Sequence, residues 1–277
     1  MSQTNLAHQE LPFFITIPHS GEKIPDQTPW LKALTEQVLM SDVDRYVDVL
    51  YQPSLDKLHI PFQKTDWHRY AVDLNRFPSD VDQDSVIGAE KKPGSHADGY
   101  HWVMTKSEIR LMTGPMTHET HDELTQLIFE PFHEGVRNYY AFFKNKNFKN
   151  VYHIDAHSMP SLGTRMHKDP GELRADIVVS DCLGKSCSKE FRDLVIAAYV
   201  TAGFKVGYNW PYLGGRVTEH YGKPDLGQHA IQVELNRNLY MDEKTKKIKP
   251  DHVLVQSKIL KALESIKSEL AKLNDKQ

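Results

Sequence analysis

The sequence predicts a single-domain α/β protein, with a mixed, mostly parallel sheet flanked by helices. Short β-favouring apolar runs alternate with longer segments of helical periodicity along the 277 residues. No internal repeat or low-complexity linker divides the chain, so we expect one catalytic domain over residues 1–277. Hydrophobic residues make up 39% and charged residues 26% of the chain, which excludes a disordered or membrane-embedded protein.

In the first half of the chain, two strands, a helical segment and a long loop are expected. Residues 13–17 (FFITI) and 70–74 (YAVDL) are β-favouring runs, each followed by turn residues. Between them, apolar residues at helical spacing across residues 29–58 predict a helix. Residues 79–101 are rich in Gly, Asp, Ser and Pro and predict a long loop. Loops of this length within compact domains are often functional.

In the second half, four strands and three helices are expected in alternation. Apolar runs rich in Val and Ile predict strands at residues 151–156, 177–179, 204–208 and 230–235. Apolar residues three and four positions apart predict helices at residues 117–146, 186–202 and 251–273. Since parallel strands need helical crossovers between them, this alternation favours a mostly parallel sheet.

Composition and charge exclude several kinds of partner. The formal net charge is −3, so there is no basic excess to neutralise a nucleic-acid backbone. The first 20 residues lack a basic segment and a sustained apolar segment, so no signal peptide is expected, and no apolar run approaches the ~18 residues of a membrane span. Cys182 and Cys187 are expected to be isolated thiols rather than a disulfide or a partial metal site. We therefore expect a cytoplasmic protein that binds neither nucleic acid nor membranes.

Polar residues recur at the predicted ends of strands. His19, Asn75, Arg76 and His157 each follow an apolar run closely, and Glu234 lies within the last run. Because ligands gather at the carboxyl ends of strands in open α/β sheets, these residues can converge although they are far apart in the sequence. We expect the functional site at that edge of the sheet.

His19, Glu22 and His157 are candidates for a catalytic zinc site. The run HSGE at residues 19–22 is an H-x-x-E motif, and His157 would complete two histidines and one carboxylate with an open fourth position. Zinc in such a site lowers the pKa of its bound water to about 7 and polarises a carbonyl group. The motif alone is a weak signal, because a turn histidine followed by a solvated glutamate has the same pattern. Asp73 could accept the free ring N–H of His19 and orient that histidine.

Asn75 and Arg76 are candidates for binding a substrate carboxylate. A planar guanidinium beside an amide suits the two oxygens of that anion. The alternative is an ordinary surface turn, which fits less well with the apolar run that precedes these residues.

Taken together, the motifs resemble the N-formylglutamate amidohydrolase family. The resemblance runs in order from about residue 13 to residue 241. It rests on PHSGEKIP at 18–25, VDLNR at 72–76, DAHSMP at 155–160, Gly214-Gly215 with Tyr221-Gly222, and HAIQVEL at 229–235 with LYM at 239–241. The family is similar in architecture to zinc carboxypeptidases, so the resemblance implies a zinc-exopeptidase-like, phosphorylase/hydrolase-like fold.

The resemblance also implies an activity and roles for the candidate residues. It implies a zinc-dependent hydrolase that cleaves the amide bond of an N-formyl or other N-acyl amino acid, such as N-formylglutamate. One Zn²⁺ per chain would be bound by His19, Glu22 and His157. Asn75 and Arg76 would hold the substrate carboxylate, and Glu234 would take a proton from the zinc-bound water.

Several placements are open. An Asp-x-Asp is common in the family, so Asp42 or Asp44 could replace Glu22 as the carboxylate ligand, although we place Glu22 first. Arg69 could bind a second carboxylate or an oxyanion, with a surface salt bridge as the equal alternative. Arg216 follows the double glycine and could also reach the substrate.

Three functions compete for this sequence. An N-acyl amino acid amidohydrolase needs a small, closed pocket. A zinc carboxypeptidase or peptidoglycan-type amidase acting on a peptide C-terminus needs an open groove. A catalytically inactive homologue would keep only its carboxylate-binding residues, and the joint presence of candidate ligands, carboxylate-binding residues and base argues against it. The expected partner is therefore a small N-acyl amino acid or a short peptide.

Overall fold

A six-stranded sheet in the order β2-β1-β3-β6-β4-β5 lies at the centre of the computed structural model, which describes residues 10–274. The strands are β1 (Phe13–Ile17), β2 (Phe62–Lys64), β3 (Val151–Met159), β4 (Ile177–Ser180), β5 (Val206–Tyr208) and β6 (Gln228–Asn236). Neighbouring strands are parallel except β4 and β6, which are antiparallel. The sheet is therefore mixed and mostly parallel, as predicted. A separate two-stranded hairpin joins β7 (Met241–Asp242) to β8 (Lys247–Ile248).

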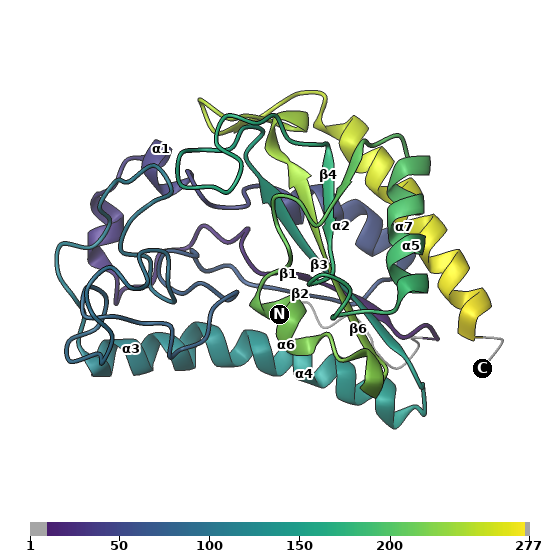
Figure 1. Cartoon of the computed structure of the whole chain (residues 1–277), viewed down its shortest axis with the longest axis horizontal. Coiled ribbons are helices and arrows are strands. Elements are labelled where there is room, and N and C mark those ends of the chain that lie inside the picture. The colour runs from purple at the N-terminus through teal and green to yellow at the C-terminus, as the bar shows by residue number, and fades with distance from the viewer. Residues whose placement is uncertain (1–9, 275–277) are drawn as a thin grey trace.

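Helices cover both faces of this sheet (Figure 1). α2 (Val47–Leu58), α5 (Lys189–Thr201) and α7 (His252–Asn274) pack on one face. On the other face, α3 (His118–Leu124), a π-helical turn (Thr125–Phe129) and α4 (Glu130–Asn145) form one long helical segment. Figure 1 shows this segment along the lower edge and α5 and α7 along the right. The short helical elements are Pro29–Ala33, α1 (Glu36–Leu39), α6 (Arg216–Tyr221), Pro224–Leu226 and Arg237–Leu239.

The alternation of side chains along β3 separates an apolar core from a polar face. Tyr152, Ile154 and Ala156 point into the core beneath α2, α5 and α7. His153, Asp155 and His157 lie on the opposite face, because side chains two positions apart share a side of a strand. All nine residues of β3 are buried, so its polar side chains need partners inside the protein.

Residues 65–117 form no helix and no strand beyond isolated bridges. Their buried aromatic and aliphatic side chains join a second core with α3, α4 and α6, which includes Tyr70, Tyr100 and Trp102. This loop-rich half lies on the left of Figure 1, beside the carboxyl ends of the central strands. It supplies one wall of the site described below.

Two predicted elements are wrong. Residues 70–74 are buried but form turns, since the N–H of Ala71 bonds to the carbonyl of His68 and that of Arg76 to the carbonyl of Asp73. The predicted helix at 29–58 is interrupted between α1 and α2, where residues 40–46 form an irregular segment. Burial in the second core explains the apolar composition in both places without requiring a regular element.

The other predicted helices and strands are present, with bounds that differ by a few residues. β3 extends to Met159 rather than ending at residue 156, so His157 lies within the strand. No helix in the described part of the chain is long and apolar enough to cross a membrane. Residues 1–9, within the segment for which no signal peptide was predicted, lie outside the described residues.

Candidate active site

His19, Asp44 and His157 converge at the carboxyl ends of β1 and β3. One nitrogen or oxygen atom from each lies within 4.8 Å of the others, and all three residues are buried. His19 comes from the turn after β1, and Asp44 from the irregular segment before α2. The N–H of Asp44 donates to the carbonyl of His19 at 3.0 Å, which lays the two segments against each other.

Both histidines present Nδ1 to the centre of this group. Nε2 of His19 donates to Asp73 Oδ1 at 2.8 Å, the hydrogen bond expected from the sequence, and Nδ1 is buried without a partner. Nε2 of His157 donates to Asp155 Oδ2 at 2.9 Å. A carboxylate on Nε2 fixes the tautomer whose Nδ1 lone pair is free, and metal-binding histidines are commonly held in this way.

Asp44, rather than Glu22, lies with the two histidines. Its Oδ2 is 2.9 Å from His157 Nδ1 and 3.6 Å from His19 Nδ1. The side chain of Glu22 is 41% exposed and pairs with Arg45 at 2.8 Å. The structure therefore corrects our preference for Glu22 over the alternative, Asp44. An H-x-x-E motif brings its two ends together on a helix, whereas here Lys23 pairs with Trp67 in an extended segment that leads Glu22 away.

The charges around this group suit a divalent cation. Asp44, Asp73 and Asp155 are buried; the buried Arg237 pairs with Asp44, and Arg69, which is 14% exposed, pairs with Asp73. Burial raises the pKa of Asp44, but the neighbouring imidazoles of His157 and His19 and the guanidinium of Arg69 outweigh that effect and hold the pKa well below its usual range. Three carboxylates thus outnumber the two guanidiniums, next to Nδ1 of His19, which has no partner, and Nδ1 of His157, which bonds to Asp44. The donor set, two nitrogens and one carboxylate oxygen, fits the three-ligand site of a catalytic zinc enzyme.

Glu234 lies beside this group on β6, paired in register with His157 on β3. Its Oε1 accepts a hydrogen bond from Gln232 Nε2 at 2.8 Å, and its Oε2 is buried without a partner. Burial raises the pKa of the Glu234 carboxyl to about 7. A carboxyl group with a pKa near neutrality can both take and return a proton at physiological pH.

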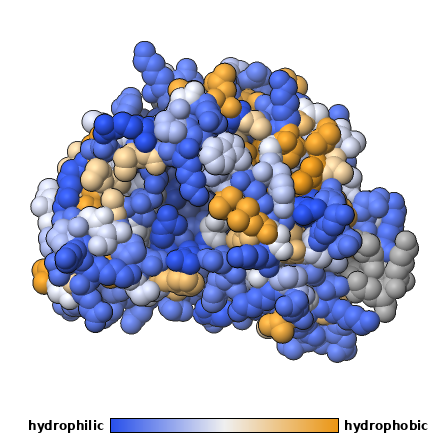
Figure 2. Space-filling model, in the orientation of Figure 1, coloured by the Kyte–Doolittle hydropathy of each residue, from blue (hydrophilic) through white to orange (hydrophobic). Residues whose placement is uncertain are grey.

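The group opens into a cavity of about 450 Å³, within the range of small-molecule sites. Its lining comes from strand ends, from the loop-rich half and from two loops, at residues 160–168 and 211–215. Figure 2 shows a hydrophilic hollow in the middle of this face of the molecule. The cavity is thus positioned over the carboxyl edge of the sheet, with charged, polar and apolar side chains in its wall.

Asn75 and Arg76 both line the cavity but have different surroundings. Oδ1 of Asn75 accepts the N–H of Val217 at 2.7 Å, and Nδ2 lies 3.3 Å from His157 Nε2. Asn75 therefore ties α6 to the site. The Arg76 side chain is 32% exposed, with Nη2 3.6 Å from Asp98 Oδ2, so its guanidinium is accessible from the cavity.

Of the two further arginine candidates, Arg69 lies at the site and Arg216 lies outside it. Arg69 lines the cavity and donates to Asp73 Oδ2 at 2.9 Å, while its Nε is buried without a partner. Arg216 does not line the cavity: it pairs with Glu219 at 2.7 Å and lies over the ring of Phe77 on the surface. The structure therefore brings Arg69 to the site and leaves Arg216 outside it.

Several residues in or next to the site were missed from the sequence. Asp155 stands two residues before His157, and strand alternation would have placed it on the same face. Arg237 directly follows β6, at the kind of strand end used to find the others. Asp98 and Lys106 come from the loop-rich half, where no periodicity points to them.

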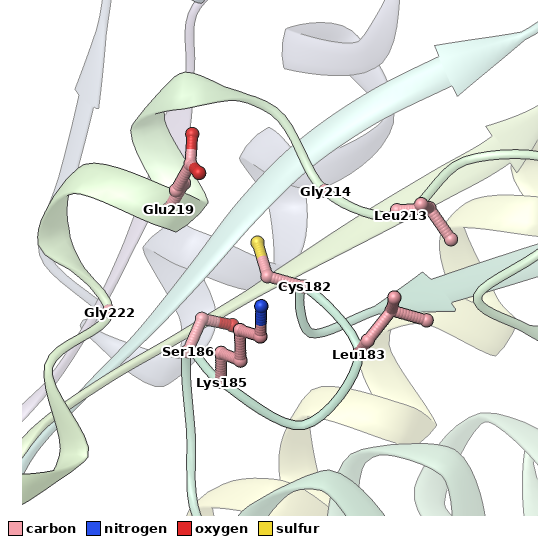
Figure 3. Close-up of a pocket in the computed structure, with 8 residues that line it drawn as sticks. All are labelled: Cys182, Leu183, Lys185, Ser186, Leu213, Gly214, Glu219 and Gly222. Carbon is pink, nitrogen blue, oxygen red and sulfur yellow. The ribbon is translucent and has the colours of Figure 1, made fainter.

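A second cavity, of about 290 Å³, lies behind the loop at residues 213–215 (Figure 3). Leu213 and Gly214 line both cavities. Gly214 has φ +120°, and a Cβ there would lie 2.7 Å from Cys182 Sγ. Only glycine therefore fits at this position in the loop that separates the two cavities. Cys182 and Cys187 are free thiols, as expected, and burial raises the pKa of Cys182 to about 11.

Comparisons with known proteins agree with this geometry. The model of the N-formylglutamate amidohydrolase family matches residues 11–241. Two curated proteins named N-formylglutamate deformylase, from Pseudomonas aeruginosa and Pseudomonas putida, are each 28% identical, over 84% and 85% of this chain and 83% and 84% of their own length. The crystal structure of an N-formylglutamate amidohydrolase from Ralstonia eutropha JMP134 superposes with a TM-score of 0.81 at 23% identity, covering 96% of this chain and 94% of that one. This last likeness shows that the fold is shared.

Proposed function

Because this chain belongs to the N-formylglutamate amidohydrolase family, we propose that it is a metal-dependent hydrolase that releases formate from N-formylglutamate. The proposal rests on one observation: Nδ1 of His19, Nδ1 of His157 and a carboxylate oxygen of Asp44 converge at the edge of a cavity, beside the unpartnered Oε2 of Glu234. A decayed, binding-only homologue would have no reason to retain a complete ligand set next to a base.

The metal we propose is one Zn²⁺ per chain, held by His19 Nδ1, His157 Nδ1 and Asp44. When bound, zinc polarises a carbonyl oxygen and lowers the pKa of water. Asp73 and Asp155 hold the two imidazole rings through Nε2, so the ligands are oriented before the ion arrives.

Glu234 acts as the general base and then as the general acid. Its Oε2 takes a proton from the water that attacks the formyl carbon, and the same group returns a proton to the amide nitrogen as the C–N bond breaks. The products are formate and the free amino group of glutamate. A pKa near 7 suits both halves of this cycle.

The substrate is oriented by cations in the cavity wall. Arg76 would bind a carboxylate, with Asn75 fixing the wall beside it, because a guanidinium presents two parallel N–H donors to that anion. Arg69 also lines the cavity and would contact a second oxygen of the substrate. The cavity volume of about 450 Å³ suits a small N-acyl amino acid better than an extended peptide.

The proposal is tested by measuring product release from a panel of substrates. Zinc-loaded protein should release formate from N-formylglutamate faster than it releases acetate from N-acetylglutamate or glutamate from the C-terminus of a dipeptide. Chelator-treated protein should be inactive and should recover when zinc is returned. A higher kcat/KM for the dipeptide would instead establish a carboxypeptidase, and inactivity of the loaded protein on all three would refute the proposal.

A further inference from the structure

One buried guanidinium joins the separate segments that form the site. Arg237 follows β6, and its side chain is 4% exposed. Nε donates to Ser158 Oγ at 3.2 Å, and Nη1 to the carbonyl of Ser41 at 2.8 Å. Nη2 lies 3.1 Å from Asp44 Oδ1 and 3.3 Å from the carbonyls of Asp42 and Ser158. All three guanidinium nitrogens are therefore engaged.

These contacts help to set the orientation of the Asp44 carboxylate. Arg237 occupies Oδ1, so Oδ2 is the oxygen that faces His157 Nδ1 at 2.9 Å and His19 Nδ1 at 3.6 Å. A carboxylate otherwise rotates readily about its last side-chain bond. The guanidinium thus holds the plane of the carboxylate, with one oxygen towards Arg237 and the other towards the two histidines.

The same side chain also holds the backbone around the ligands. The carbonyls of Ser41 and Asp42 belong to the irregular segment that carries Asp44, which has no helix or strand of its own to fix it. Ser158 is the neighbour of His157 on β3. One group therefore sets the separation between the segment that bears Asp44 and the strand that bears His157.

We propose that Arg237 is the positioning residue of the metal site: it aims Asp44 Oδ2 at the two histidines and ties residues 41–44 to β3. The inference rests on the proposed function for the identity of the ligands and adds the residue that organises them. A lysine could not replace it, because an ammonium carries its donors on a single nitrogen and cannot span these partners.

The experiment measures zinc affinity directly, by competition with a chelator, for metal-free wild type, Arg237→Lys and Arg237→Met. Both substitutions should weaken zinc binding by about 10–100-fold, the usual cost of losing a partner of a metal ligand. Arg174 provides the matched control, since it is equally buried and bonds to Asp169 at 2.7 and 2.8 Å without contacting Asp44. Arg174→Lys and Arg174→Met should lower Tm and leave zinc affinity unchanged.

A double-mutant cycle shows whether Arg237 acts through Asp44. In an Asp44→Ala background, Arg237→Met should cost no further zinc affinity, because the group that it positions is gone. If Arg237→Met does not fold, Arg237→Lys is compared with Arg174→Lys. Wild-type zinc affinity in either Arg237 variant would overturn this inference and leave the proposed function intact. Failure of the wild type to bind zinc would overturn the proposed function itself.

Discussion

Glu234 is buried and its Oε2 has no hydrogen-bond partner. A single substitution can measure what this carboxylate contributes to the reaction. Glu234→Gln preserves the shape of the side chain and its place beside Gln232 but removes the proton acceptor. We expect zinc affinity to be retained and kcat to fall by about 10²–10⁴-fold. Steady-state formate release and zinc titration of the same preparation check this. A variant with wild-type kcat would remove Glu234 from the mechanism.

The choice of Asp44 over Glu22 can be decided by substituting each with its amide. Asp44→Asn should lose most of its zinc affinity, because Oδ2 is the oxygen aimed at the histidines. Glu22→Gln should bind zinc like the wild type, since Glu22 is exposed and paired with Arg45. Metal analysis of both proteins after dialysis gives the answer, and the opposite order of affinities would restore Glu22 as the ligand.

Two arginines test how the carboxylate is recognised. Arg76→Ala should raise KM for N-formylglutamate while zinc affinity stays the same, because Arg76 lines the cavity and contacts no proposed ligand. Arg216→Ala should leave KM unchanged, since Arg216 pairs with Glu219 on the surface. Kinetics with the free acid and with its amide complete the test. Equal turnover of the two by the wild type would contradict carboxylate recognition.

The sequence predicted the long central strands correctly but not the short or irregular segments. Long apolar runs such as 151–156 and 230–235 gave central strands, because a strand covered on both faces needs nearly continuous apolar or paired residues. Residues 70–74 have the same composition but are buried as turns in the second core. An apolar run indicates that a segment is buried. The segment forms a strand only when its backbone also hydrogen-bonds to a neighbouring strand. β2 has three residues, too short to leave a pattern.

The site, like the fold, was predicted in part from the sequence. Strand ends identified His19, His157 and Glu234, which the structure brings together. The carboxylate partner depended on the conformation of the chain after β1, which is extended, and on the irregular segment before α2. Neither has a periodic signature, so Asp44 could be named only as an alternative.

α6 is attached to the site through a close glycine contact. A Cβ at Gly215 would lie 2.2 Å from Nδ2 of Asn75, the residue whose Oδ1 holds the N–H of Val217. Gly215→Ala should therefore displace Asn75, lower the free energy of unfolding by about 1–3 kcal/mol and reduce activity. Gly114→Ala is the control, since nothing lies within 4 Å of its added Cβ. Urea unfolding and formate release of the two variants should differ; matching results would show that the α6 contact adapts.

At the scale of the whole molecule, buried neutral histidines make stability depend on pH. Burial lowers the pKa of His68, His133 and His153 to about 4 and that of His101 to about 3. In the unfolded chain a histidine titrates near 6.5. The unfolded state therefore binds more protons below about pH 6.5, and the free energy of unfolding should fall as pH drops from there towards 4.

His157 contributes in the opposite sense in metal-free protein, because Asp155 raises its pKa well above the ordinary value despite burial. Glu234 acts in the same sense, because burial raises its pKa to about 7. These two groups are outweighed by the four histidines that are buried neutral. Urea unfolding of metal-free protein between about pH 7 and pH 4.5 measures the net proton uptake from the slope. A stability that is flat or rises as pH falls would show that these histidines are not neutral in the folded state.

The ligands of the proposed metal site are separated by long stretches of chain, and this has a consequence for how the protein is made. His19 follows β1 and His157 lies on the neighbouring parallel strand β3, yet nearly half the sequence runs between them, and Arg237 comes later still. Contacts of such high sequence separation form slowly, after the chain has closed large loops. A newly synthesised chain therefore has no preformed binding site to offer until most of the sheet exists. Metal uptake becomes a late event in maturation, and the ion stabilises a finished fold without directing its assembly.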